Sequence, residues 1–201
     1  MKRICVFCGS NLGNHPDYTV IARQLGETLA LNQIELIYGG ANVGLMRITA
    51  EEALKNKGKV TGVITHFLAE KHLTLPGLTE LILVDTMHER KAKMAELADG
   101  FIALPGGYGT LEELFEILTA AQLGFHHKPV AIINIHGYYD FMKLQLEKMV
   151  DEKLLLAPHS GIAQFVNTPD EALNAMQNYS PPVVGKWIED IRKDNGHSLE
   201  N

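Results

Sequence analysis

The stretch LPGGYGTLEE, at residues 104–113, decides the fold class because its glycines join a strand pattern to a helix pattern. The apolar run Phe101–Leu104 is short enough to be a buried strand. After the glycines, Leu111, Leu114 and Leu118 recur at helical spacing. The stretch therefore predicts a strand, a glycine turn and a helix in succession.

This turn has the properties of a phosphate site. Gly106, Gly107 and Gly109 lack the Cβ atoms that would keep a ligand away from the backbone. Thr110 could cap the helix, and unpaired N–H groups would meet the positive end of the helix dipole there. Glu113 stands three residues after Thr110. It is either the partner in a capping box or a catalytic acid/base, and spacing alone leaves both open.

The nonapeptide PGGYGTLEE, at residues 105–113, resembles the Pro-Gly-Gly-x-Gly-Thr-x-x-Glu signature of the LONELY GUY (LOG) family, once widely labelled "possible lysine decarboxylases". The resemblance extends over residues 4–176. LOG proteins are nucleoside 5'-monophosphate phosphoribohydrolases that act on cytokinin ribotides and often on AMP. The resemblance thus implies a hydrolase of cytokinin biosynthesis, an N-glycosidase that releases a free base and ribose 5-phosphate.

Two turns nearer the N-terminus extend the resemblance. The CGS turn at residues 8–10 is similar to one that lines the nucleotide pocket in LOG proteins, although Ser10 could instead cap a helix. The segment GGANVGLM, at residues 39–46, is similar to the family's Gly-Gly-x-x-x-Gly-Leu-Met-Gly. Arg47 replaces the last glycine of that pattern, which affects the expected helix packing there and not the site itself.

The segment MHERK, at residues 87–91, is similar to Met-His-x-Arg-Lys of the LOG family, in which the arginine is needed for activity. Arg90 and Lys91 fall at the end of the first turn of a predicted helix, where basic residues oppose the helix dipole. A bound anion would explain them, and a solvated charged face is the alternative. Arg90 could hold a 5'-phosphate or the carboxylate of Glu113.

The resemblance implies two catalytic residues, Glu113 and Arg90. It implies a larger set that binds the nucleoside monophosphate, spread over the four turns and the helix after residue 107. This set is Ser10, Gly40, Gly44, Met87, Arg90, Lys91, Gly106, Gly107, Tyr108, Gly109, Thr110, Leu111, Glu112, Glu113 and Thr119.

Strand-length apolar runs alternate with helical patterns along the chain, which predicts an α/β, doubly wound, Rossmann-like three-layer fold with a mostly parallel sheet. We expect one nucleotide-binding domain over residues 1–180, with a C-terminal helix and flexible tail over residues 181–201. Ligands bind at the carboxyl ends of the strands in such sheets, so the four turns should form one pocket. The first turn lacks the Gly-x-Gly-x-x-Gly spacing of NAD-binding proteins.

Two helices are expected to flank these turns. Asp17 should cap the first, which runs to about Asn32. A later helix over residues 140–153 should turn Phe141, Leu144 and Met149 inward.

Composition excludes several classes of partner. The 201 residues are 46% hydrophobic and carry a formal net charge of −6, so neither a nucleic-acid polymer nor an anionic membrane is expected. Apolar runs are too short to span a bilayer, and the N-terminus lacks a signal-peptide core, which favours a cytoplasmic protein. Cys5 and Cys8 have neither a second pair of ligands nor a histidine cluster, so we expect no metal site. We also expect no cofactor.

Two rival functions remain at this level. A non-catalytic nucleotide-binding protein could use the same phosphate turn. A pyridoxal-phosphate decarboxylase would need a lysine beside that turn, and none lies between Lys93 and Lys128. The base pocket cannot be read, so AMP and N6-modified ribotides are not distinguished. The resemblance also implies a homodimer, for which residues 111–123 are apolar enough to serve as an interface.

Overall fold

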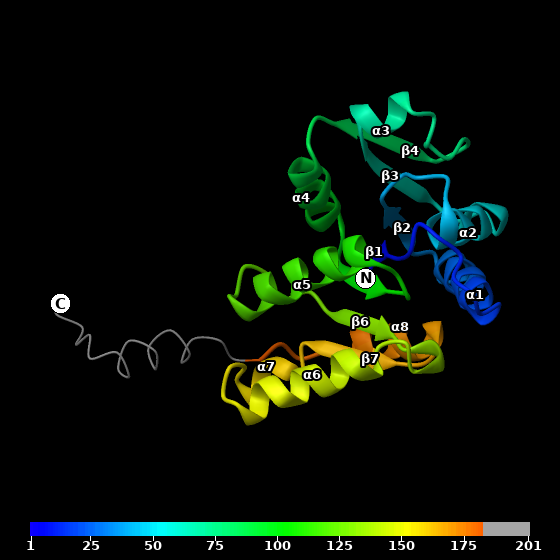
Figure 1. The fold of residues 1–201 in the computed structure, drawn as a ribbon. Coiled ribbons are helices and arrows are strands. Elements are labelled where there is room, and N and C mark those ends of the chain that lie inside the picture. The colour runs from blue at the N-terminus through cyan, green and yellow to red at the C-terminus, as the bar shows by residue number, and fades with distance from the viewer. Residues whose placement is uncertain (183–201) are drawn as a thin grey trace.

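A computed structural model describes residues 1–182, so the C-terminal helix and tail predicted over residues 181–201 lie outside the described residues from residue 183 onward. One sheet of seven strands runs through the molecule in the order β4-β3-β2-β1-β5-β6-β7 (Figure 1). All neighbouring strands pair in parallel. The strands are β1 (Arg3–Phe7), β2 (Glu35–Tyr38), β3 (Val60–Thr65), β4 (Glu80–Val84), β5 (Gly100–Ala103), β6 (Val130–Ile133) and β7 (Ala163–Val166).

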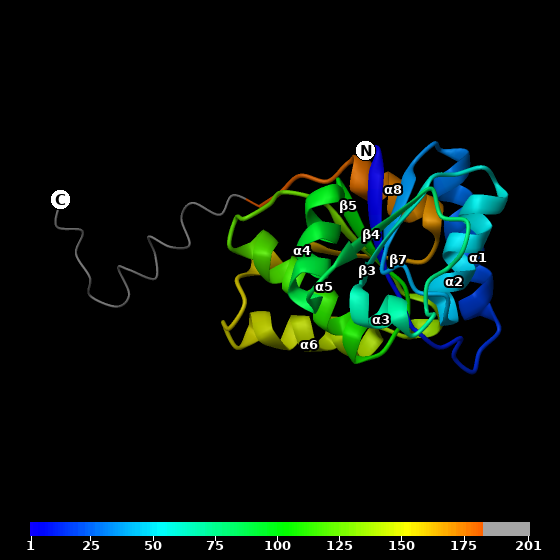
Figure 2. The ribbon, with the colours of Figure 1, turned by 90° about the horizontal axis from the view of Figure 1, so that it is seen from above.

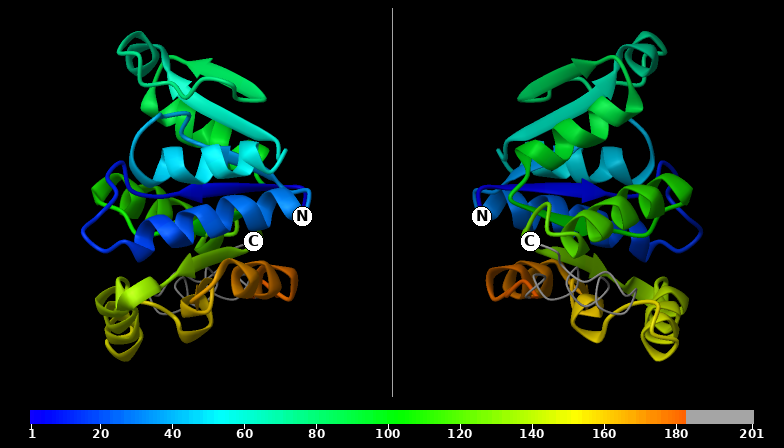
Figure 3. Two further views of the ribbon diagram at one scale, coloured as in Figure 1. Left: turned by 90° about the vertical axis from the view of Figure 1, so that its right-hand side faces the viewer. Right: turned by 90° about the vertical axis from the view of Figure 1, so that its left-hand side faces the viewer.

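Helices cover both faces of this sheet. One layer holds α1 (Asp17–Leu31), α2 (Gly44–Lys55) and α8 (Pro169–Gln177). The other holds α4 (Met87–Leu97), α5 (Tyr108–Gln122) and α6 (Asp140–Asp151). The view from above places the sheet between the two layers (Figure 2), and the two side views show one layer each (Figure 3). Three short helices complete the described part: α3 (His66–Glu70), the 3₁₀ helix η1 (Ile135–Gly137) and α7 (Ala157–Ser160).

The central strands β1, β2, β3, β5 and β6 are buried on both sides, which is why they read as continuous apolar runs, whereas the edge strand β4 is partly exposed. In β1, Ile4 and Val6 belong to the hydrophobic cluster beneath α1, α2 and α8. Cys5 and Phe7 belong to the cluster beneath α4, α5 and α6. The predicted α/β, doubly wound, three-layer class is confirmed.

The chain order of the strands reverses at β1. From β1 the chain builds outward through β2, β3 and β4, and it then returns to place β5 on the other side of β1. Cys5 is consequently in register with Ile37 of β2 on one side and with Phe101 of β5 on the other. The turns that leave neighbouring strands diverge at such a reversal and leave a crevice at the carboxyl ends.

Two expectations about the helices are wrong. Asp17 does not cap α1, because the cap position is Pro16 and Asp17 is the first helical residue. In α6, Phe141 and Leu144 are 84% and 57% exposed, while Met149 does pack against the core. The helix lies over the β6–β7 end of the sheet, where a single chain offers α6 little to cover the outer side chains.

Within residues 1–182, no helix combines the length and the apolar composition needed to cross a membrane.

Candidate active site

Three of the predicted turns are joined by backbone hydrogen bonds at the crevice beside β1. The N–H of Gly9, after β1, donates to the carbonyl of Pro105, after β5, at 3.0 Å. The carbonyl of Gly9 accepts the N–H of Leu45, at the start of α2, also at 3.0 Å. A Cβ atom on Gly44 would lie 2.2 Å from the carbonyl carbon of Ser10. Only glycine therefore lets these turns approach so closely.

The turn after β5 carries free backbone donors. Helix α5 begins at Tyr108 with Gly107 as its cap, and no side chain caps it. Within the described residues, the N–H groups of Tyr108, Gly109 and Thr110 have no acceptor. A Cβ atom on Gly107 or Gly109 would meet no atom within 4 Å, so the space above them is open. Open amides at the positive end of a 15-residue helix are suited to binding an anion.

The capping interpretation of Thr110 and Glu113 is wrong. Because α5 starts at Tyr108, Thr110 is its third residue and is buried, with 4% of its surface exposed. Its hydroxyl packs against Gly106, where a Cβ atom would lie 2.1 Å from it. Glu113 is one turn further along the helix, so the structure leaves its carboxylate free for another role.

Glu113 is instead bound by Arg90. The Arg90 side chain is 8% exposed, and its Nη1 donates to Glu113 Oε1 at 3.5 Å. Its Nε donates to the carbonyl of Val63 at 2.9 Å, and its Nη2 donates to the carbonyl of Gly39 at 3.0 Å. A Cβ atom on residue 39 would lie 1.7 Å from Nη2, so the glycine makes room for the guanidinium. Of the two roles open to Arg90, the geometry favours holding the glutamate.

The environment of Glu113 changes its acidity. Burial raises the pKa of this carboxyl to about 7, while the neighbouring Arg90 charge lowers it and Glu112 raises it. A carboxyl with a pKa near neutrality can gain or lose a proton during a reaction at physiological pH.

Lys91 turns toward the acidic side of α5 and not toward its free amides. It forms ion pairs with Glu112 and, at 2.9 Å, with Glu116. These hydrogen bonds raise the pKa of the Lys91 amine. The lysine thus joins α4 to α5 and fixes the helix that carries Glu113.

Two cavities border α5, one at the turn before its start and one along its middle. A cleft of about 210 Å³ is lined by Ser10, Gly106, Gly107 and two tyrosines, Tyr18 and Tyr138. Glu113 does not line it. A smaller cavity of about 150 Å³ between α4 and α5 is lined by Glu113 with Phe7, Lys91, Ala92, Ala95, Glu116, Ile117, Ala120 and His126.

Tyr138 was missed in the sequence. Its hydroxyl donates to the carbonyl of Gly106 at 2.5 Å, and Tyr139 donates to the carbonyl of Leu104 at 2.7 Å. The sequence signal that could have found Tyr138 is its place in the turn that follows β6. The carboxyl ends of parallel strands meet at one edge of the sheet, so this turn should lie near the other turns.

The remaining predicted residues are dispersed around this centre. Gly40 is buried with φ of 71°, and its carbonyl accepts the N–H of Leu75 at 3.1 Å. Met87 is half exposed at the start of α4, and Tyr108 is 94% exposed. Leu111 packs against the core. Thr119 lies on the exposed side of α5, in a groove with α6 and α7, and does not line either cavity just described.

Comparisons with known proteins agree on one family. Residues 46–176 match the family described as "Possible lysine decarboxylase". The chain is 44% identical to the cytokinin riboside 5'-monophosphate phosphoribohydrolase LOG7 of Arabidopsis thaliana, over 90% of this chain and 83% of that protein. It is 44% identical to the probable cytokinin riboside 5'-monophosphate phosphoribohydrolase LOGL5 of Oryza sativa subsp. japonica, over 90% of this chain and 74% of the relative.

Solved structures support the fold. The molybdenum cofactor binding protein of Rippkaea orientalis superimposes with a TM-score of 0.67, at 22% identity, over 88% of this chain and 96% of that chain. At this identity the likeness concerns the three-layer architecture alone.

The raised pKa of Glu113 has a consequence for stability. Between about pH 4.5 and 7 the folded chain keeps a proton that the unfolded chain has released, so Glu113 lowers stability as pH rises through this window. Glu113→Gln removes that cost. We expect the stability of the wild type relative to the variant to fall by on the order of 2–3 kcal/mol between pH 5 and pH 8, whatever the variant loses at Arg90.

Urea unfolding at the two pH values measures this difference. Glu147→Gln, which changes an exposed carboxyl of α6, is the matched control and should show no such pH dependence. A Glu113→Gln protein that loses as much stability as the wild type between pH 5 and pH 8 would contradict the assignment.

Proposed function

The chain belongs to the LOG family of cytokinin riboside 5'-monophosphate phosphoribohydrolases, and from this premise we propose how its residues carry out the reaction. The enzyme is a hydrolase that cleaves the N-glycosidic bond of a nucleoside 5'-monophosphate and yields the free base and ribose 5-phosphate. Its substrates are cytokinin ribotides, AMP or both.

One observation carries the proposed mechanism: helix α5 supplies both an anion site and a buried carboxylate. Its first amides, at Tyr108, Gly109 and Thr110, are free to bind the 5'-phosphate. Glu113 lies one turn further along the same helix. A substrate anchored by its phosphate would therefore hold its ribose within reach of the carboxylate.

The chemistry requires a negative charge at that position. As the bond between C1' and the base nitrogen breaks, positive charge develops on the ribose. The Glu113 carboxylate stabilises this charge and accepts a proton from the attacking water. The water oxygen forms the new bond to C1', and the base leaves with the bonding electrons and takes up a proton. A positioned acid/base group of this kind contributes roughly 10²–10⁴-fold in rate.

Arg90 is proposed as a positioning residue in this scheme. Two of its donors are bound to the carbonyls of Val63, within β3, and Gly39, directly after β2, and these bonds fix the guanidinium. It favours the ionised form of Glu113 and sets the direction of the carboxylate.

The rival functions are less compatible with these contacts. A protein that only binds nucleotides has no use for a carboxylate buried against an arginine at the anion site. A pyridoxal-phosphate decarboxylase needs a free lysine, and Lys91, the basic residue nearest in sequence to Arg90, is paired with Glu112 and Glu116. The first rival predicts no free base from AMP, and the second predicts absorbance from bound pyridoxal phosphate.

We further propose that the enzyme is a homodimer whose partner completes the site. Thr119, which the family resemblance implies in substrate binding, faces away from the cleft of its own chain. It shares a groove of about 220 Å³ with Phe115 and with residues of α6 and α7. Exposed apolar side chains border this face: Phe115, Leu123, Phe125, Phe141, Leu144 and Leu154. A second copy would cover them and bring Thr119 to the partner's substrate.

A cytoplasmic location is proposed on the state of the thiols. Cys5 and Cys8 are both buried and unpaired, as is usual in a reducing compartment. We also propose residues 1–180 as the nucleotide-binding domain.

The anion site predicts that the 5'-phosphate is required. Charge-assisted hydrogen bonds contribute roughly 1.5–3 kcal/mol each, so losing two of them costs about a hundredfold or more in kcat/KM. Adenosine should accordingly be a much poorer substrate than AMP. Quantifying the free base released from a panel of AMP, N6-prenylated AMP and the matching nucleosides measures this and identifies the preferred base.

Gly107 offers a matched pair of variants for the same prediction. Gly107→Ala adds a neutral methyl group to the space proposed for the phosphate and should lower activity less than a charged side chain does. Gly107→Asp adds a negative charge at the proposed phosphate site and should abolish most of it. Equal cleavage of adenosine and AMP, or equal activity in the two variants, would show that the glycines only let strand and helix pack.

The dimer proposal predicts twice the mass of one chain in light scattering at micromolar concentration. Phe115→Asp, which places a charge in the groove beside Thr119, should yield monomers with strongly reduced activity. Leu31→Asp, which changes an exposed leucine of α1 on the opposite layer, is the control and should remain dimeric. A fully active monomer would refute a shared site.

A further inference from the structure

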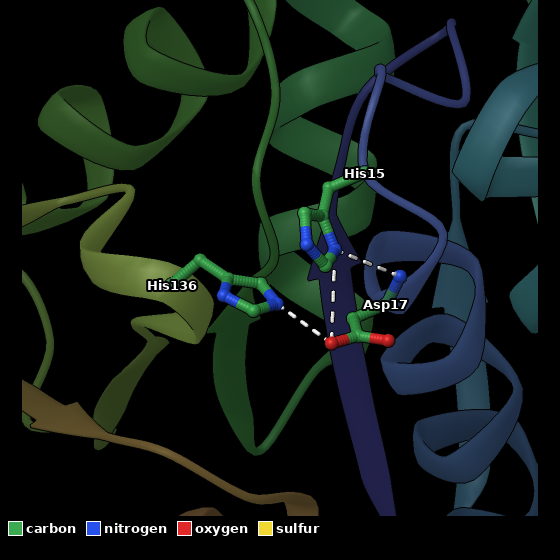
Figure 4. Close-up of side chains that lie close together, drawn as sticks. All are labelled: His15, Asp17 and His136. Carbon is green, nitrogen blue, oxygen red and sulfur yellow. Dashed lines mark hydrogen bonds and ion pairs between the residues drawn. The ribbon is translucent and has the colours of Figure 1, made fainter.

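A cluster of three potential metal ligands lies beside the cleft and has no role in the proposed reaction. His15 precedes α1, Asp17 is its first residue, and His136 lies in η1 (Figure 4). His136 Nε2 is 2.7 Å from Asp17 Oδ2, and His15 Nδ1 is 3.6 Å from the same oxygen. One ligand atom from each residue lies within 4.8 Å of the other two.

One contact of this cluster also serves the fold, because the N–H of Asp17 donates to His15 Nδ1 at 3.3 Å, but the Asp17 carboxylate is not used by the helix. Asp17 makes no cap for α1, so its carboxylate is free to face the two imidazoles. The three side chains are 40–48% exposed, which leaves them open to an ion from solvent. His136 reaches the cluster from a backbone φ of 54°, in the left-handed region. The rings of His15 and His136 consequently lie 3.8 Å apart between centroids.

Two imidazoles and one carboxylate match a borderline transition-metal ion. Zn²⁺ is bound by histidine nitrogen and carboxylate oxygen at about 2.0–2.2 Å, which places neighbouring ligand atoms of a tetrahedral site roughly 3.3 Å apart. The observed separations of 2.7 and 3.6 Å lie on either side of this spacing, so small side-chain rotations would suffice. Ca²⁺ and Mg²⁺ prefer oxygen ligands and fit less well.

The cluster also connects the two walls of the cleft. Tyr18, on α1, lies edge-on to His136 at 6.4 Å between ring centroids, and both Tyr18 and Tyr138 line the cleft. Tyr138 stands two residues after His136, and its hydroxyl donates to the carbonyl of Gly106. An ion bound by the cluster would tie the start of α1 to η1 and thereby hold Tyr138 against the phosphate turn.

We propose that His15, Asp17 and His136 form a binding site for one divalent transition-metal ion of the Zn²⁺ type, and that the bound ion fastens the cleft walls together. Three protein ligands leave a fourth position of a tetrahedral ion open to water or an anion. The site is separate from Glu113, so metal binding stands independently of catalysis.

The test is a titration of chelator-treated, full-length protein with Zn²⁺ by calorimetry, with thermal unfolding in parallel. We expect one ion per chain and a higher Tm with Zn²⁺. Asp17→Asn keeps the side-chain shape, and His136→Asn suits the left-handed backbone. Each should weaken Zn²⁺ affinity by about tenfold or more, because each removes one direct ligand. The visible absorbance of bound Co²⁺ should change in both variants.

His66→Ala is the matched control, because His66 lies 3.8 Å from Asp85 and residues 1–182 offer this pair no third ligand. It should bind Zn²⁺ like the wild type. Absence of Zn²⁺ binding at micromolar concentration, or equal affinity in the wild type and both cluster variants, would overturn the site. In that case the three residues form only an ion-pair cluster. Binding that leaves Tm unchanged would refute the fastening role. These readouts do not depend on turnover, so they are unaffected if the proposed reaction is wrong.

Discussion

The buried guanidinium of Arg90 is the interaction on which the centre of this protein depends. A cation removed from water is costly unless its donors and its charge are satisfied. Here the carbonyls of Val63 and Gly39 accept two hydrogen bonds, and Glu113 supplies the opposite charge. The guanidinium thereby links β3 and the turn after β2 to α5. The absence of a side chain at Gly39 follows from the same requirement for space.

Two turns of α5 accordingly have different proposed functions. The first turn keeps its amides free because glycines precede it and no side chain caps it. The next turn carries Glu113 into a partly buried environment, where Arg90 fixes its direction. The proposed phosphate site is compatible with a formal net charge of −6, since the helix dipole and the free amides act locally. The reversal of strand order at β1 places the turns of Ser10 and Gly106 beside these amides.

Much of this could be predicted from the sequence, because the strands are continuous apolar runs and the glycine turns follow them. The errors arose where tertiary contacts decide. The position of Thr110 suggested a cap, but α5 starts at Tyr108, two residues before Thr110, because Gly107 takes the cap position. Asp17 also resembled a cap, because aspartate is a favoured cap residue and precedes a helical pattern, but Pro16 takes the cap position. The exposed side of α6 could not be foreseen, since amphipathic spacing does not reveal what covers a helix. The approach of His136 to Asp17 joins residues 119 positions apart and has no local signal.

The central claim is that the Glu113 carboxylate carries out the cleavage while Arg90 holds it. The most direct measurement is the rate of base release from AMP by Glu113→Gln, with folding verified by circular dichroism and with Glu147→Gln as the control. Our account predicts a loss of roughly 10²–10⁴-fold in kcat for Glu113→Gln, because the amide keeps the shape of the side chain and lacks its charge. Near wild-type turnover in a folded Glu113→Gln protein would contradict it.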